Sequence, residues 1–442
     1  MRALAGLASA VVLGLAACGV VEDPAPLPSG PLASFPDAGP PATEPQDAGV
    51  VDAGVLVYPS GVTHSPLPPD VVRHLRAIAA RAPARRDDLF AKVGDSNTVH
   101  AHHLTCFAGA QVELAGHAAL EPTLAWFRAG RVDGGTPFER LSLAATVGWS
   151  AGAALAGAPS PLQQELDATQ ARFASVMFGT NDVGAQDPFT FGRHLFALVD
   201  ALTAQGVVPL VSSVPPRDDS PAADAWVARY NLVARGVAQA RRVPFVDLHR
   251  ELRAAPTHGL GPDGIHLSVF GAGGARACVF TPAGLGAGHN VRNLVVLEAL
   301  ARARAAVVEG VASDDLAPRR EGSGLPGDEL VIDALPFVDP RDTRTAGTAR
   351  MGSYPGCGAL AEGGREVLYR LELRQPTAVR AFVVSPGGAD VDLHLLSALT
   401  GEACLARGDR LLTRQLAAGR YWLSVDSTAA QAGEYLLVVM AD

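Results

Sequence analysis

Residues 88–98 read DLFAKVGDSNT, an apolar run that ends at a glycine and continues into a turn carrying a serine. A short apolar run bounded by turn residues is typical of a buried β-strand. Similar runs occur at 171–178, 207–212 and 243–248, and stretches with helical spacing lie near 188–205 and 221–241. Strands that alternate with helices predict a parallel sheet covered by helices on both faces. We therefore expect a three-layer α/β domain over residues 68–311.

Polar side chains follow the first two predicted strands. Ser96 lies in Gly94-Asp95-Ser96, and Asn181 lies in Gly179-Thr180-Asn181-Asp182. Ligands of such sheets bind beyond the carboxyl ends of the strands. There a serine hydroxyl can act as a nucleophile, and an asparagine amide can donate to a developing oxyanion. Taken singly, each motif is explained equally well as a turn, because Gly, Asp, Asn and Ser are common turn residues.

A third motif, Asp263-Gly264-Ile265-His266, lies in a loop flanked by glycine and proline. A separation of three residues lets the Asp263 carboxylate accept a hydrogen bond from one imidazole nitrogen of His266, which fixes the tautomer and orientation of the ring. A histidine near an aspartate on a protein surface is common, so this motif is also weak when it is taken alone.

Together, in this order and at strand ends, the three motifs resemble the SGNH (GDSL-like) hydrolase family over about residues 88–300. The resemblance implies a flavodoxin-like domain and an acyl-serine mechanism that needs no cofactor. It implies that Ser96 is the nucleophile, with Asp263 and His266 as its partners. The oxyanion hole would comprise the Asn181 amide and the backbone N–H groups of Ser96 and Gly148. The Gly148 block is the poorest match, because Ser142 and Ala145 stand where the family more often has asparagine and glycine.

A competing motif overlaps this block. Residues 148–152 read GWSAG, a literal G-x-S-x-G, which would make Ser150 the nucleophile of an α/β-hydrolase elbow. If that interpretation were correct, the presence of three separate SGNH motifs in the right order would be a coincidence. It also needs an aspartate well separated from the histidine, whereas Asp263 precedes His266 by only three residues. We therefore favour Ser96.

Three histidines follow the serine closely, at His100, His102 and His103. No carboxylate accompanies them locally, so we expect side chains that face solvent or line a pocket, and we predict no metal site.

The N-terminal residues resemble an export signal. An apolar stretch over residues 3–17 is too short to span a bilayer. Its end, Leu15-Ala16-Ala17-Cys18, resembles the bacterial lipobox, which implies a signal peptide over 1–17 and a lipidated Cys18. Gly19, where inner-membrane retention would place aspartate, favours the outer membrane. The alternative is an ordinary cleaved signal peptide with an incidental cysteine. Residues 18–67 are rich in Pro, Ala, Asp and Gly and predict a disordered tether.

Export would place the remaining cysteines in a compartment that permits disulfides. These are Cys106, Cys278, Cys357 and Cys404. Three pairings are possible, of which pairing within each domain is the simplest.

The sequence pattern of the C-terminal part differs from that of residues 68–311. A segment rich in charge, glycine and proline over 312–330 predicts a linker, and short alternating runs over 331–442 predict an antiparallel β-sandwich. The pieces VLYR (367–370), DVDLHL (390–395) and GRYWLSVD (419–426) resemble the bacterial pre-peptidase C-terminal domain. Asp390 and Asp392 could contribute to a calcium site, but outward polar residues of an alternating strand explain them as well.

Composition and motifs limit the function classes. The 442 residues carry a formal net charge of −9 and no long basic run, which disfavours nucleic-acid binding. We expect a lipid-anchored serine esterase acting on acylated polysaccharide, lipid or small acyl esters. The alternatives are a non-catalytic glycan-binding surface lipoprotein and an acyltransferase that uses the same triad. The intact Ser96, Asn181, Asp263 and His266 argue against a degenerate hydrolase.

Overall fold

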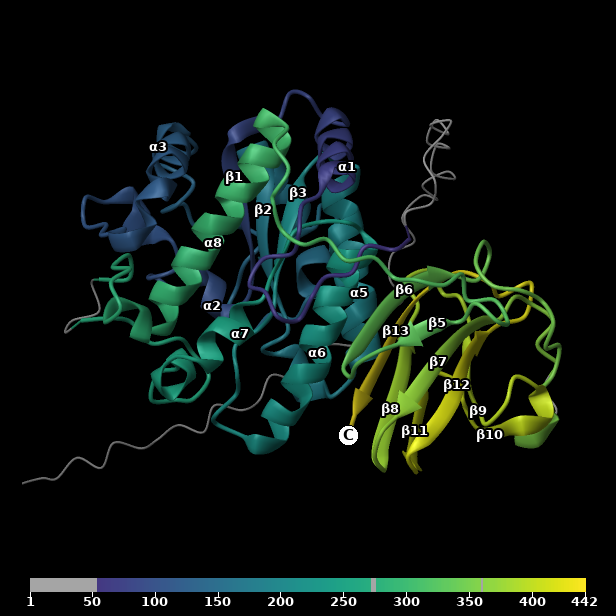
Figure 1. Cartoon of the computed structure of the whole chain (residues 1–442). Coiled ribbons are helices and arrows are strands. Elements are labelled where there is room, and N and C mark those ends of the chain that lie inside the picture. The colour runs from purple at the N-terminus through teal and green to yellow at the C-terminus, as the bar shows by residue number, and fades with distance from the viewer. Residues whose placement is uncertain (1–53, 272–275, 359–360) are drawn as a thin grey trace, which may run out of the picture. The chain divides into compact units, whose positions relative to one another are not determined.

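A computed structural model of the chain describes residues 54–271, 276–358 and 361–442 (Figure 1). The predicted signal peptide, Cys18 and the first part of the tether lie outside these residues. None of the helices in the described segments is long and apolar enough to cross a membrane.

The predicted parallel sheet is confirmed. Its strands are β1 (Arg86–Gly94), β2 (Ala171–Met177), β3 (Val208–Ser212) and β4 (Phe245–Val246), all parallel and hydrogen-bonded in that order. On the other side of β1, Gly94 forms a parallel bridge with Ala145. The segment around Ala145 follows β1 in sequence but lies outside it in the sheet, which gives the flavodoxin-like order.

Helices flank this sheet, and two of them match the predicted ones. These are α5 (Pro188–Ala204) and α6 (Pro221–Ala240), which pack against each other. Each begins with a proline in its first turn after a side-chain cap, from Asp187 and Ser220 respectively. The other helices are α1 (Pro69–Ala80), the one-turn α2 (Ser96–Val99), α3 (Glu121–Ala129), α4 (Pro161–Thr169), α7 (Leu248–Arg253) and α8 (Gly288–Arg304). Figure 1 shows the long α8 crossing one face of the sheet.

Residues 54–67 differ from the predicted tether. Leu56, Tyr58 and Leu67 are buried in the core of the α/β part. The Tyr58 hydroxyl donates to the carbonyl oxygen of Val243 at 3.0 Å. Because these large apolar side chains pack against the domain, ordered chain begins before the expected boundary at residue 67.

The C-terminal part is the predicted β-sandwich. One sheet has the order β10-β9-β12-β7-β5 and the other the order β11-β8-β13-β6. Their strands are β5 (Leu330–Ile332), β6 (Phe337–Asp342), β7 (Val367–Leu373), β8 (Thr377–Val384), β9 (Asp392–Leu396), β10 (Cys404–Gly408), β11 (Leu411–Leu416), β12 (Gly419–Asp426) and β13 (Glu434–Ala441). All pairs are antiparallel except β5 with β7. Asp390 accepts from Gln431 Nε2 at 2.9 Å, and Asp392 accepts from Arg407 Nη2 at 2.9 Å, so both carboxylates have protein partners.

The sandwich packs against the α/β part through apolar side chains. Val384 of β8 and Leu436 of β13 belong to the same buried cluster as the helices beneath them. Gly192 of α5 and Gly236 of α6 allow this approach, since a Cβ there would lie 2.6 Å from Val384 Cγ1 and 2.5 Å from Leu436 Cδ1. The two parts therefore share a continuous apolar contact.

Two disulfides join Cys106 to Cys278 and Cys357 to Cys404. This is the pairing within each part of the chain that was the simplest of the three possibilities.

Candidate active site

Ser96 occupies a sharp junction between β1 and α2. The strand ends at Gly94, and Asp95 caps the following turn by accepting from the backbone N–H of Asn97 at 3.0 Å. A Cβ at Gly94 would lie 2.2 Å from Thr98 Oγ1, so only glycine permits the chain to turn this tightly. The serine is thereby held at the carboxyl edge of the sheet.

Ser96, His266 and Asp263 form a continuous chain of hydrogen bonds. Ser96 Oγ lies 3.0 Å from His266 Nε2, and His266 Nδ1 lies 2.6 Å from Asp263 Oδ2. The other carboxylate oxygen of Asp263 accepts from the backbone N–H groups of Ile265 and His266, at 3.1 and 3.0 Å. A carboxylate at Nδ1 leaves Nε2 able to accept the serine proton.

Asp263 is ionised in this arrangement. Partial burial acts to raise its pKa, but hydrogen bonds from His266 and Ile265 outweigh burial and lower the pKa to about 2. At neutral pH the carboxylate therefore carries the charge that stabilises a protonated His266.

Two of the three predicted oxyanion donors, Asn181 and Gly148, lie on neighbouring segments. Asn181 follows β2, and its Nδ2 donates to the carbonyl oxygen of Trp149 at 3.0 Å. That contact places the amide beside Gly148, an exposed residue with φ +81°. The Gly94–Ala145 bridge holds the segment leading to Gly148 against the end of β1. An amide nitrogen has two donors, so one N–H of Asn181 is left for a ligand.

Ser150 makes no comparable contact. Within the part of the chain that the structure describes, its side chain has no hydrogen bond to a histidine, whereas Ser96 has one. The backbone at 148–152 consists of turns and irregular structure that follow a single bridge, so the strand-to-helix elbow of the G-x-S-x-G interpretation is absent there.

The histidines after the serine differ in environment. His100 lines a cavity, and its ring stacks on that of His289 with centroids 4.3 Å apart. His103 is fully buried, which corrects the expectation of a solvent-facing or pocket-lining side chain, and burial lowers its pKa well below the usual value. In the described residues, no group of three or more His, Cys, Asp or Glu side chains is arranged to hold a metal ion.

Asp182, the last residue of the asparagine motif, is buried beneath the site. Its carboxyl oxygens accept from the backbone N–H of Ala151 at 3.2 and 3.3 Å. Burial raises its pKa from 3.8 to about 7, although that hydrogen bond acts in the opposite direction.

This shift predicts a pH-dependent stability. Between its unfolded pKa and about 7, Asp182 holds a proton in the folded state that it releases on unfolding, so stability falls as pH rises and levels off above this window. We expect Asp182→Asn, which stays neutral and keeps an acceptor for Ala151, to remove on the order of 2–3 kcal/mol of the stability change between about pH 5 and pH 8. Calorimetric unfolding of both proteins at the two pH values measures the difference. Equal pH dependence in the two would contradict the assignment.

Arg292 supports the nucleophile turn, a role that no motif in the sequence predicts. This α8 residue is 1% exposed, and its guanidinium donates to the Asn97 carbonyl at 2.6 Å and to Thr98 Oγ1 at 3.0 Å. Burial raises the pKa of Asp95 and lowers that of Arg292 to about 10, while the attraction between the two charges acts against both shifts. The only available signal was the polar run GHNVRN (288–293) at the start of a helix that is buried nearly all round.

The family to which these residues are similar agrees with this geometry. Residues 92–273 match the GDSL-like Lipase/Acylhydrolase family. No curated protein matches the chain. Among solved structures, an acetylxylan esterase from Geobacillus stearothermophilus is 16% identical, with a TM-score of 0.31 over 48% of this chain and 93% of the esterase. The pre-peptidase C-terminal domain of a Bacillus anthracis collagenase is also 16% identical, with a TM-score of 0.18 over 24% of this chain and 89% of that domain.

The family match spans Ser96, Gly148, Asn181, Asp263 and His266, the residues that the fold brings to one edge of the sheet. Residues 92–273 thus form a GDSL-like lipase/acylhydrolase domain, that of a serine ester hydrolase.

Proposed function

We propose that the chain hydrolyses carboxylic esters through an acyl intermediate on Ser96. The observation that carries this proposal is the series from Ser96 Oγ to His266 Nε2 at 3.0 Å and from His266 Nδ1 to Asp263 at 2.6 Å. Such a series is what an activated serine nucleophile requires.

In the proposed mechanism, His266 Nε2 accepts the hydroxyl proton of Ser96 as its oxygen attacks the ester carbonyl. The negative charge that develops on the carbonyl oxygen is stabilised by the N–H groups of Ser96 and Gly148 and by the Asn181 amide. His266 then gives its proton to the departing alcohol oxygen. A water molecule, activated by the same imidazole, releases the carboxylic acid and restores Ser96.

Hydrolysis is favoured over transfer by the exposure of the site. The side chains of His266 and Asp263 are 39% and 49% exposed, so water reaches the acyl-enzyme freely. The same openness suits esters carried on a large molecule, and we propose acylated polysaccharides, lipids or small acyl esters as substrates.

We further propose that the protein is exported and lipid-anchored through Cys18. The lipobox-like Leu15-Ala16-Ala17-Cys18 supports the anchor, and two disulfides support an oxidising compartment. Membrane fractionation tests this: Cys18→Ser should move the protein from the membrane to the soluble fraction, and an unchanged distribution would count against the anchor.

The esterase function is tested with an activity assay and a covalent probe. The purified protein should hydrolyse p-nitrophenyl acetate, and a fluorophosphonate should inactivate it by forming one adduct. Peptide mass mapping should place the adduct on Ser96. An adduct on Ser150, or folded protein that is inert toward both reagents, would overturn the proposal.

A further inference from the structure

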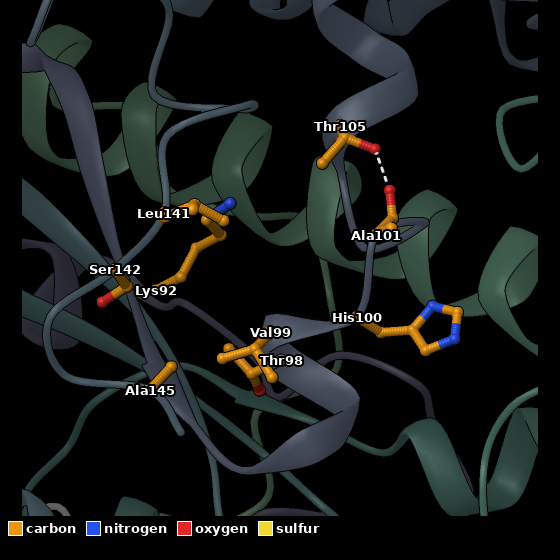
Figure 2. Close-up of a pocket in the computed structure, with 9 residues that line it drawn as sticks. All are labelled: Lys92, Thr98, Val99, His100, Ala101, Thr105, Leu141, Ser142 and Ala145. Carbon is orange, nitrogen blue, oxygen red and sulfur yellow. Dashed lines mark hydrogen bonds between the residues drawn. The ribbon is translucent and has the colours of Figure 1, made fainter. Parts of the chain in front are cut away.

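A cavity of about 250 Å³ lies beside the nucleophile turn (Figure 2). One wall comes from α2 and the residues after it, including Val99, Ala101 and Thr105. The other comes from the segment before Gly148, including Leu141 and Ala145.

Both walls belong to segments that adjoin the proposed catalytic residues, although none of those residues is itself part of the lining. Val99 belongs to the same helical turn as Ser96. On the opposite wall, Ala145 forms the bridge with Gly94, two residues before the nucleophile, and lies three residues before Gly148. The cavity therefore lies next to the turn that carries Ser96.

The lining points to the acyl side of the ester rather than the alcohol side. The departing alcohol must face His266, which returns a proton to it. None of the residues that line the cavity comes from the loop that carries Asp263 and His266. The absence of that loop from the lining favours the acyl side of the ester over the alcohol side.

The walls of the cavity are mainly apolar. Lys92 contributes its aliphatic stem, because its ammonium is buried and donates to the carbonyl oxygen of Phe138 at 3.0 Å. Figure 2 shows this stem extending toward Leu141. Leu141 and the nearby Leu143 are 79% and 48% exposed and continue the apolar surface outward. The volume of the cavity is below the roughly 300–1,000 Å³ of a complete ligand pocket, so it can hold one substituent of an ester rather than the whole substrate.

We propose that this cavity receives the acyl chain of the ester, and that the preferred substrates carry aliphatic acyl groups longer than acetyl. The inference rests on the esterase function proposed above and specifies its substrate class. Each methylene that enters the cavity is expected to raise kcat/KM by about fourfold, since burial of a CH₂ removes it from water.

The test compares p-nitrophenyl acetate, butyrate and hexanoate, which share one leaving group. For the wild-type protein, kcat/KM should rise from acetate to hexanoate by at least about tenfold. Ala101→Phe places a ring in the cavity from an exposed position and should flatten the profile, so that within this variant the kcat/KM values for hexanoate and acetate differ by no more than about twofold. Ala118→Phe, at an exposed alanine that does not line the cavity, is the matched control and should keep the wild-type profile.

The possible outcomes distinguish a failure of the acyl-cavity inference from a failure of the proposed esterase function on which it rests. Efficient acetate hydrolysis with no gain for longer chains would overturn the acyl cavity and leave the esterase intact. A gain that survives Ala101→Phe would also overturn it, because the chain would then bind elsewhere. Failure to hydrolyse any of the three esters would instead contradict the proposed esterase function.

Discussion

Replacing Ser96 by alanine is expected to lower kcat for p-nitrophenyl acetate by about 10⁴- to 10⁶-fold, because no other group can form the acyl intermediate. The side chain is small and lies at the edge of the sheet, so its loss leaves the Asp263–His266 hydrogen bond in place. The melting temperature should therefore stay close to that of the wild type. The residual rate reports what the oxyanion donors contribute without a nucleophile.

Ser150→Ala is the matched control, because it removes the same hydroxyl from the competing G-x-S-x-G motif. We expect its kcat to remain within about threefold of the wild type, since its side chain makes no hydrogen bond to a histidine in the described structure. Full activity in Ser96→Ala together with loss in Ser150→Ala would reverse the assignment of the nucleophile. The comparison is quantitative when both variants are titrated with the same fluorophosphonate.

The sequence predicted the parts of the site that lie in local motifs. Ser96, Asn181 and the Asp263–His266 pair each lie next to or within a short segment whose pattern is visible in the chain itself. Their meeting also follows from the fold, because the carboxyl ends of parallel strands share one edge of the sheet. Spacing also favoured Ser96 over the serine of the overlapping G-x-S-x-G motif, since Asp263 and His266 lie on one loop.

Features that depend on long-range packing were not predicted. The Gly94–Ala145 pairing is a single bridge, too short to give a strand pattern. Strand β6 contains Pro340, which argues against a strand in sequence but is tolerated because β6 is an edge of its sheet. His103 is polar by type, yet the fold buries it completely. In each case the environment is set by residues far away in the chain.

Arg292→Met is expected to lower the free energy of unfolding by about 3–5 kcal/mol, the cost of leaving a buried charge without its partner. The guanidinium supplies two hydrogen bonds to the turn that carries Ser96, and it is the positive charge that offsets the buried Asp95. Chemical denaturation at neutral pH measures the loss. Arg302→Met, on the same helix but paired with Asp315 at the surface, should cost no more than about 1 kcal/mol. Equal losses in the two variants would show that burial of the charge is not what matters.

A double variant separates the charge from the packing. Asp95→Asn keeps an oxygen that can accept from Asn97 but removes the negative charge. If the unpaired Asp95 carboxylate accounts for the instability, adding Asp95→Asn to Arg292→Met should restore about 1–2 kcal/mol, a coupling expected of two charges that attract each other. The loss in Arg292→Met should also shrink at acidic pH, because burial already raises the pKa of Asp95 and the carboxyl takes up a proton once its counter-charge is gone. Additive losses that do not change with pH would mean that Arg292 stabilises the turn through its hydrogen bonds alone.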